Sequence, residues 1–226
     1  MSYMGQYNLM DPSSIVQVEM TLFHDHALMI ILSIFTFVSL MGFLLMKSHF
    51  SSRRLHEAQK LETFWTLFPA LLLIILGLPS LRNLYMFDEQ PMKSENTLKV
   101  TGHQWYWSYE SELWNNKSFD SYMIMTNNLS SGDYRLLEVD NRVMVPSNIH
   151  SMISTTSMDV IHAWTMPSLG IKMDSVPGRL NMSVLFPLMN GVYYGQCSEI
   201  CGANHAFMPI ALESVPLMIY YNTLYS

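Results

Sequence analysis

Two long apolar runs dominate the pattern of hydrophobic and polar positions in the first third of the chain. Residues 27–46 contain no charged side chain, and neither do residues 63–81. A helix of about 20 residues is roughly 30 Å long, which matches the hydrocarbon core of a bilayer. Pro69, Gly77 and Pro79 interrupt the second run, but membrane-spanning helices tolerate such residues. The two runs predict a transmembrane helical hairpin.

The segment between the runs, residues 47–61, is basic. It carries four Lys or Arg residues and a single acid, Glu57. Short basic loops stay on the side of the membrane where synthesis occurs, so both chain ends and everything after the hairpin are expected on the other side. Glu62 follows this loop at the mouth of the second helix. It is either a solvated acid at a helix start or the entrance of a proton path.

From residue 88 onward the pattern changes to short runs rich in β-branched and aromatic residues. Gly, Pro, Asn and Asp punctuate these runs, as expected for a β-sandwich. The expected strands are 98–110, 134–139, 142–145, 149–156, 179–185, 191–195 and 210–215. The predicted fold is therefore a two-helix transmembrane hairpin followed by an all-β Greek-key sandwich. Its parts are an N-terminal segment (1–25), the hairpin (26–87) and the sandwich (88–226).

Composition agrees with a membrane protein and constrains its partners. The chain is 50% hydrophobic and 13% charged, a balance that favours membrane classes. Residues 83–226 carry thirteen acidic and seven basic side chains. Nucleic acid requires a basic patch, so this domain is not expected to bind it. An acidic domain favours a cationic partner.

The densest chemistry lies in one short stretch with the spacing C-x3-C-x3-H-x2-M, formed by Cys197, Cys201, His205 and Met208. Thiolate, imidazole and thioether are soft ligands, which favour copper or iron–sulfur clusters over magnesium or calcium. A single blue-copper site uses one thiolate, and this stretch offers two. Two thiolates in one tight loop are able to bridge two copper ions. The pattern therefore predicts a dinuclear copper site that lacks only a further histidine.

The alternatives for this loop are a disulfide and a zinc site. Two cysteines suffice for a disulfide, but a neighbouring His and Met favour metal binding. Methionine is a poor zinc ligand. The additional histidine has three candidates in the β domain, His103, His150 and His162. His162 follows a predicted strand and lies well upstream of the loop, so spacing favours it without excluding the others.

Longer motifs carry a resemblance to a known family. They are residues 102–110, 118–123, 135–142, 176–181 and 193–202. With these motifs the sequence resembles the second subunits of mitochondrial cytochrome c oxidase, over nearly the whole chain and including the hairpin. The resemblance implies a cupredoxin-like β domain in the intermembrane space. It also implies a two-helix anchor in the mitochondrial inner membrane, in contact with lipids.

The resemblance also assigns ligands. Cys197 and Cys201 bridge two coppers. One copper is completed by His162 and Met208, the other by His205 and the backbone carbonyl of Glu199. The Glu199 carboxylate reaches a magnesium ion shared with the large heme-bearing subunit, and a carboxylate oxygen suits that hard ion. Judged from its surroundings in the sequence alone, Glu199 is a solvated loop acid.

The partner expected from the resemblance is cytochrome c, a small basic protein. In Trp105-Tyr106-Trp107 the family places electron uptake at the first tryptophan, Trp105, although such aromatics more often pack in cores. The expected docking acids are Glu110, Asp140 and Asp159. The chain departs from the family at Asn115, Asn116 and Met158, where relatives carry acids, so the docking field is weaker or shifted towards Glu112. For Glu62 the resemblance favours the proton-path interpretation.

The function that follows is electron transfer within a proton-pumping oxidase. The dinuclear centre accepts electrons from reduced cytochrome c and passes them to the large subunit, where oxygen is reduced. This chain is then an oxidoreductase subunit without an oxygen-reducing site of its own. Two other functions use similar features. A membrane-anchored copper carrier needs an open, exchangeable site, and the quinol-oxidase type of this subunit lacks the copper ligands.

Overall fold

The computed structural model describes residues 6–50, 57–88, 94, 96–111, 113 and 118–224. Two compact units make up the chain. One is Glu19–Glu89, and the other combines Met1–Val18 with Gln90–Ser226. The boundaries expected after residues 25 and 87 stay a prediction.

Two long helices, α1 (Ile15–Lys47) and α2 (Gln59–Asp88), contain the two apolar runs. Both are long and apolar enough to cross a bilayer, and none of the residues in their most apolar stretches is buried. α1 begins earlier than the apolar run because Ser14 acts as its N-cap, with Oγ accepting from the Gln17 N–H at 3.1 Å. Within the helical unit, Asn83 Nδ2 donates to the Glu19 carbonyl at 3.4 Å. The predicted helical hairpin is confirmed.

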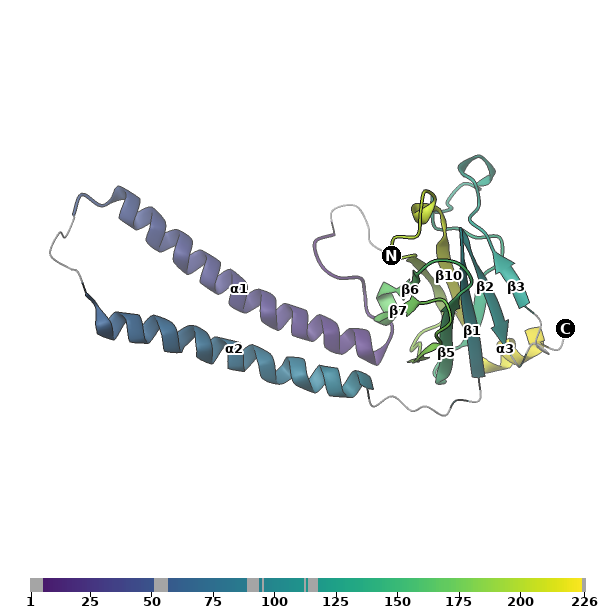
Figure 1. Cartoon of the computed structure of the whole chain (residues 1–226), viewed down its shortest axis with the longest axis horizontal. Coiled ribbons are helices and arrows are strands. Elements are labelled where there is room, and N and C mark those ends of the chain that lie inside the picture. Colours follow the sequence, from purple (N-terminus) through teal and green to yellow (C-terminus); the bar gives the residue numbers. More distant parts are fainter. Residues whose placement is uncertain are drawn as a thin grey trace. The chain divides into compact units, whose positions relative to one another are not determined.

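The second unit is rich in β-strands (Figure 1). Its strands are β1 (Asn96–His103), β2 (Tyr106–Ser111), β3 (Ser118–Ser121), β4 (Val143–Pro146), β5 (Ser151–Ser157), β6 (His162–Met166), β7 (Ile171–Ser175), β8 (Asn181–Leu185), β9 (Gly191–Gln196) and β10 (Pro209–Val215). Three sheets form, in the orders β3-β2-β1-β5-β8, β4-β10-β9 and β6-β7. Two pairs are parallel, β1 with β5 and β10 with β4. The β-rich domain after a hairpin confirms the expected fold class, a cupredoxin-like sandwich.

The core of this unit follows from strict alternation along the strands. Along β1 every second residue is buried, and β2 and β5 show the same alternation. Trp107 and Tyr109 of β2 and Trp164 of β6 are completely buried in this core. Cys197, Cys201 and Met208 belong to the same cluster, so the ligand loop is anchored directly on the hydrophobic core.

Two expected strands differ from the structure. The expected strand 98–110 is instead two antiparallel strands, β1 and β2, joined by a turn at Gln104 and Trp105. In the second, residues 134–139, residues 135–137 form a turn and Val139 makes only an isolated bridge to Met123. Leu136 has a φ of 68°, a left-handed conformation that a strand does not contain. The sequence pattern also missed β3, β6, β7 and the C-terminal helix α3 (Leu217–Leu224), which are all short. His162, expected in a loop at a strand end, is the first residue of β6.

Candidate metal centre

The ligand loop connects two neighbouring antiparallel strands. β9 ends at Gln196 and β10 begins at Pro209, and these two residues are paired. Cys197 and Met208 therefore come directly after and before the last pair, so the strands bring the two ends of the loop together. The short 3-10 helix η4 (His205–Phe207) forms the return of the loop. Register alone thus places Cys197 and Met208 near each other.

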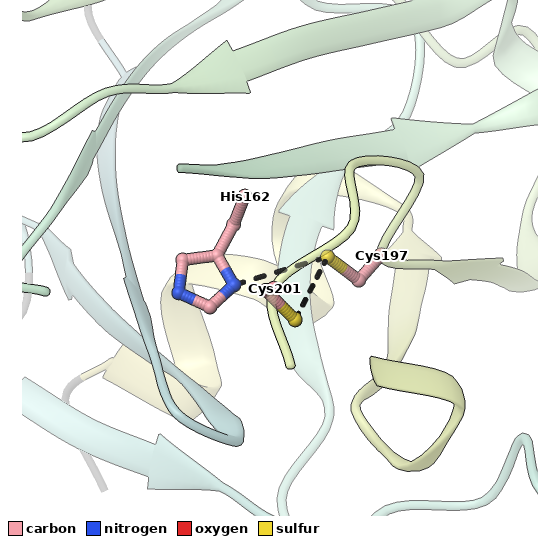
Figure 2. A group of neighbouring side chains, drawn as sticks. All are labelled: His162, Cys197 and Cys201. Carbon is pink, nitrogen blue, oxygen red and sulfur yellow. Dashed lines mark hydrogen bonds between the residues drawn. The ribbon is translucent and has the colours of Figure 1, made fainter. Parts of the chain in front are cut away.

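The remote histidine comes from β6, which contacts β9. Ser198 N donates to the Ala163 carbonyl at 3.1 Å and ties the loop to the residue after His162. Figure 2 shows the His162 ring directed at the Cys197 thiol, with Cys201 beside it. The nitrogen Nδ1 of His162 lies 3.9 Å from Cys197 Sγ, and the two sulfurs are 4.0 Å apart.

The other expected donors surround the same sulfurs. Cys201 Sγ lies 3.4 Å from His205 Nδ1 and 3.5 Å from Met208 Sδ. The Glu199 carbonyl oxygen lies 3.4 Å from Cys197 Sγ. The structure therefore brings all six expected donor groups together, namely His162, Cys197, Glu199, Cys201, His205 and Met208. Among the described residues, the only group of three or more His, Cys, Asp or Glu residues able to hold an ion is His162, Cys197 and Cys201, and it includes neither His103 nor His150.

The chemistry of the donor atoms indicates which metal suits the site. Its ligand atoms from His162, Cys197 and Cys201 lie within 4.8 Å of one another, and all three residues are buried. Both cysteines are free thiols, and a separation of 4.0 Å is about twice the length of a disulfide bond. Two thiols, two imidazoles and a thioether fit copper, since soft donors favour it and methionine is seldom a zinc ligand.

Electrostatics favour one thiolate in the absence of metal. Burial raises the pKa of Cys197, but hydrogen bonds with His162 and with the Ala163 and Glu199 backbone outweigh this effect and lower it overall. Burial and the neighbouring Cys197 both raise the pKa of Cys201. Burial lowers the pKa of His162, but its hydrogen bonds with Cys197 and Asp159 outweigh burial and raise it overall. A metal cation that binds here replaces protons on these groups.

Packing around His162 leaves its ring little freedom. A β-carbon at Gly102 would lie 2.8 Å from His162 Cδ2, so the ring occupies space that any other residue would fill. Trp107 contacts the ring edge-on, with centroids 5.8 Å apart, and its Nε1 donates to the Met208 carbonyl at 3.3 Å. On the far side of the ring, Nε2 lies 2.8 Å from Asp159 Oδ1. Sequence reasoning missed this contact, although the spacing of three residues was visible.

Trp105 lies against the same loop. A β-carbon at Gly202 would stand 3.1 Å from Trp105 Cζ2. The preceding residue, Gln104, donates from Nε2 to the Cys201 carbonyl at 2.8 Å. Trp105 is partly exposed, and among the described residues its buried Nε1 has no hydrogen-bond acceptor. The indole thus bridges the surface and the loop that holds the thiols.

The expected docking acids differ in their local partners. Glu110 Oε2 pairs with Lys99 Nζ at 3.1 Å. Asp140 Oδ1 accepts from the Tyr122 and Asn141 N–H groups at 2.8 and 2.7 Å. Asp159 binds His162. Glu112, Asn115 and Asn116 lie outside the described residues, and Met158 is 72% exposed.

The carboxylates of Glu199 and Glu62 lie in different surroundings. Glu199 borders a cavity of about 580 Å³, which Lys172, Asp174 and Arg179 also line. Glu199 and Asp174 are the acidic residues at this cavity, and Lys172 and Arg179 are the basic ones. Glu62 lies in the first turn of α2 and is exposed.

Comparison with known proteins identifies the family. A profile described as "Cytochrome C oxidase subunit II, periplasmic domain" matches residues 96–215, and one for the transmembrane domain of the same subunit matches residues 2–83. The chain belongs to the cytochrome c oxidase subunit II family. Cytochrome c oxidase subunit 2 of Albinaria caerulea is 59% identical over 215 residues, 95% of this chain and 96% of that protein. The Drosophila melanogaster protein is 50% identical over 217 residues, 96% of this chain and 95% of its own length.

A solved structure of the family agrees with the β domain. The periplasmic domain of subunit II of the cytochrome oxidase of Bradyrhizobium japonicum is 42% identical, with a TM-score of 0.54 over 59% of this chain and 93% of that domain. As a subunit II protein, the chain is the electron-transferring subunit of cytochrome c oxidase, an oxidoreductase complex. It is a membrane protein with a C-terminal domain outside the bilayer.

Proposed function

We propose that the loop between β9 and β10, together with His162, holds a pair of copper ions that receives electrons from cytochrome c. The observation that supports it most directly is the pair of sulfurs 4.0 Å apart, each with its own imidazole nitrogen. Cys197 has His162 at 3.9 Å, and Cys201 has His205 at 3.4 Å. Met208 and the Glu199 carbonyl would complete the ligand set. When bound, the copper pair supplies a one-electron carrier with its charge shared across both thiolates.

The buried position of the donors favours electron transfer over copper delivery. His162 is 0%, Met208 1%, Cys201 4% and Cys197 6% exposed. A carrier that hands copper to another protein needs donors that the recipient is able to reach. Of the five donor side chains only His205 is partly exposed, and the other four are enclosed by the core. Rigid enclosure instead keeps one ligand geometry before and after electron transfer. The complete Cys, His and Met set also argues against the copper-free quinol-oxidase type.

Trp105 is the proposed point at which electrons arrive. Its indole is partly exposed on one side and lies against Gly202 on the other. Gln104 links this segment to the loop through its hydrogen bond to the Cys201 carbonyl. Trp105 is therefore one peptide bond away from a residue that is hydrogen-bonded to the Cys201 carbonyl. Beside Trp105, the rings of His103 and Tyr106 are stacked with centroids 4.5 Å apart, which gives the surface a flat aromatic part.

The partners, the magnesium ligand, the location and the proton path are proposed by analogy with the second subunits of the family. The partner is cytochrome c, attracted by Glu110, Asp140 and Asp159, and the large heme-bearing subunit accepts the electrons. The Glu199 carboxylate contributes to a magnesium ion shared with that subunit, supported by the cavity beside Asp174. The location is the mitochondrial inner membrane, with lipids around α1 and α2 and the β domain in the intermembrane space. Glu62 stands at the entrance of a proton path in the coupled, proton-pumping complex.

Electron paramagnetic resonance of the full chain in detergent, loaded with copper, tests the proposal. Two coppers that share one unpaired electron equally give a hyperfine pattern of seven lines. A four-line pattern from a single copper would contradict the dinuclear site. Binding of zinc with no copper signal would contradict copper altogether.

A further inference from the structure

Asp159 lies in the turn between β5 and β6, and both of its carboxylate oxygens are occupied. Oδ1 accepts from His162 Nε2 at 2.8 Å and from the Val160 N–H at 2.6 Å, while the Ser157 hydroxyl donates its proton to the Val160 carbonyl. Oδ2 accepts from the Gln104 N–H at 2.6 Å. The side chain is only 31% exposed. A carboxylate with three internal donors is part of the architecture of the site, whatever its effect at the surface.

We propose that Asp159 is a positioning residue that holds the ligand histidine and the electron-accepting tryptophan in one fixed arrangement. Its Oδ1 sets the His162 ring, and its Oδ2 sets the Gln104–Trp105 segment. This inference rests on the proposed copper site and on Trp105 as the residue that accepts electrons. It adds a role that differs from docking, since it acts inside the domain.

Each carboxylate oxygen of Asp159 makes one of the two contacts, or arms, of this arrangement. The first arm, from Oδ1 to the His162 ring, determines which nitrogen of His162 is a ligand. A hydrogen bond to Asp159 places the ring proton on Nε2, which leaves the Nδ1 lone pair directed at Cys197. Outer partners of this kind fix the tautomer and orientation of ligand histidines and increase their basicity. Packing by Gly102 and Trp107 limits ring rotation, but it does not select the tautomer. That selection requires an acceptor, and Asp159 provides it.

The second arm, from Oδ2 to Gln104, connects Asp159 to the Cys201 side of the loop between β9 and β10. From Asp159 Oδ2 the connection runs to the Gln104 N–H at 2.6 Å, and from Gln104 Nε2 to the Cys201 carbonyl at 2.8 Å. Trp105 follows Gln104 and packs on Gly202. One carboxylate thus links strand β6, the β1–β2 turn and the cysteine loop. Loss of this link releases the ligand ring and the indole at once.

Three variants of Asp159 separate positioning from docking. Asp159→Asn keeps one carbonyl acceptor, so it is able to satisfy only one arm and places an amide donor against the other. Asp159→Glu keeps the charge but adds a methylene group, which moves both oxygens away from their donors. Asp159→Ala removes both arms. Asp140→Asn is the matched control, because it removes the same charge without a hydrogen bond to an expected ligand.

The experiment measures the hyperfine pattern, reduction potential and copper affinity of the full chain loaded with copper in detergent. We expect all three Asp159 variants to change the hyperfine pattern and potential, and copper affinity to fall by about 10- to 100-fold in Asp159→Ala. In hyperfine pattern, reduction potential and copper affinity, Asp140→Asn is expected to equal the wild type, because its carboxylate accepts only from the Tyr122 and Asn141 N–H groups. A wild-type pattern, potential and affinity in Asp159→Ala would overturn the proposal. If the alanine variant does not fold, the same measurements on Asp159→Asn and Asp159→Glu decide.

Electron uptake from cytochrome c, measured in the assembled oxidase at several salt concentrations, gives a second readout. Positioning predicts that Asp159→Glu, which keeps the charge, still lowers the uptake rate at saturating cytochrome c. If Asp159→Ala and Asp159→Asn slow only the association with cytochrome c, and Asp159→Glu associates at the wild-type rate, the residue acts in docking. That result would overturn the proposal. Failure of the Asp159 proposal is distinguishable from failure of the proposed copper site. The wild-type chain must show the seven-line pattern before any variant is compared with it.

Discussion

The indole of Trp105 packs so closely on Gly202 that a β-carbon there would stand 3.1 Å from Cζ2 and 3.4 Å from Nε1. Gly202 also has a φ of +127°, which residues with a side chain seldom adopt. Glycine is therefore required at position 202 for two reasons: its backbone conformation disfavours a side chain, and the Trp105 ring occupies the space that a side chain would need. The proposed electron-accepting residue is seated on the loop that carries both thiols.

Gly202→Ala should displace Trp105 and slow electron uptake. The added methyl group has to push the indole away or shift the loop, so we expect the rate of electron uptake to fall about tenfold while cytochrome c binding changes little. Gly132→Ala is a matched control, because Gly132 has a φ of +103° and nothing within 4 Å of its β-carbon position. Stopped-flow mixing with reduced cytochrome c measures the rate. Equal losses in both variants would show that backbone strain alone is responsible.

Trp105→Phe is expected to slow electron uptake at saturating cytochrome c without weakening binding. Phenylalanine retains an apolar ring but is smaller and harder to oxidise, so the coupling through Gly202 decreases. We expect the loss in rate to be about tenfold or more, which corresponds to about 1.4 kcal/mol in activation free energy. Rapid mixing gives the rate, and the dependence on cytochrome c concentration gives the binding constant. Weaker binding with an unchanged limiting rate would make Trp105 a packing residue.

Met208→Leu tests the thioether with little disturbance of the fold. Leucine has a similar volume, and swaps of this kind usually cost less than about 1.5 kcal/mol of stability. Because the Sδ atom 3.5 Å from Cys201 Sγ is lost, we expect a changed copper hyperfine pattern and a higher reduction potential. Met173→Leu is the control, since Met173 is buried in the same core but is not an expected ligand. Identical spectra for the two variants would remove Met208 from the ligand set.

The parts of the molecule that were predictable from sequence are those set by local patterns. Helix positions followed from the apolar runs, and the short spacing from Cys197 to Met208 placed four donors in one loop. The choice of His162 depends on β6 lying beside β9, a contact between distant segments that spacing favours but does not determine. Likewise, the sequence around Asp159 does not predict its hydrogen bond with the Gln104 N–H. At Leu136, a hydrophobic pattern typical of a strand coincides with a left-handed turn.

Removal of surface charge at Glu110 and Asp140 should slow association with cytochrome c. The double change Glu110→Gln and Asp140→Asn is expected to lower the association rate at low salt several-fold. The difference from wild type should disappear as salt approaches about 0.1 M and above, where the screening length falls to about 10 Å or less. The limiting electron-transfer rate should not change, because neither residue contacts the ligands. Rates measured across a salt series check this, and a salt-independent loss would contradict docking at these acids.

Glu138 should stabilise the β domain in a pH-dependent manner. Its side chain is 6% exposed, and it accepts from Tyr194 Oη at 2.7 Å and from an Arg142 guanidinium nitrogen at 3.0 Å. Burial raises the pKa of Glu138, but these hydrogen bonds outweigh burial and lower it overall. A carboxylate with a lowered folded-state pKa contributes its full stabilisation above the unfolded pKa, about 4.3 for glutamate, and loses it as pH falls through the folded value.

Glu138→Gln should therefore lower the stability of the domain by about 1–3 kcal/mol near pH 7, and by progressively less as the pH falls below about 4. Melting curves of the full chain in detergent, recorded from pH 3 to pH 8, measure this difference. Glu110→Gln makes the same chemical change at an exposed ion pair with Lys99, which contributes at most about 1 kcal/mol. A loss in Glu138→Gln that stays constant over this pH range would show that the charge of Glu138 is not the source of its contribution.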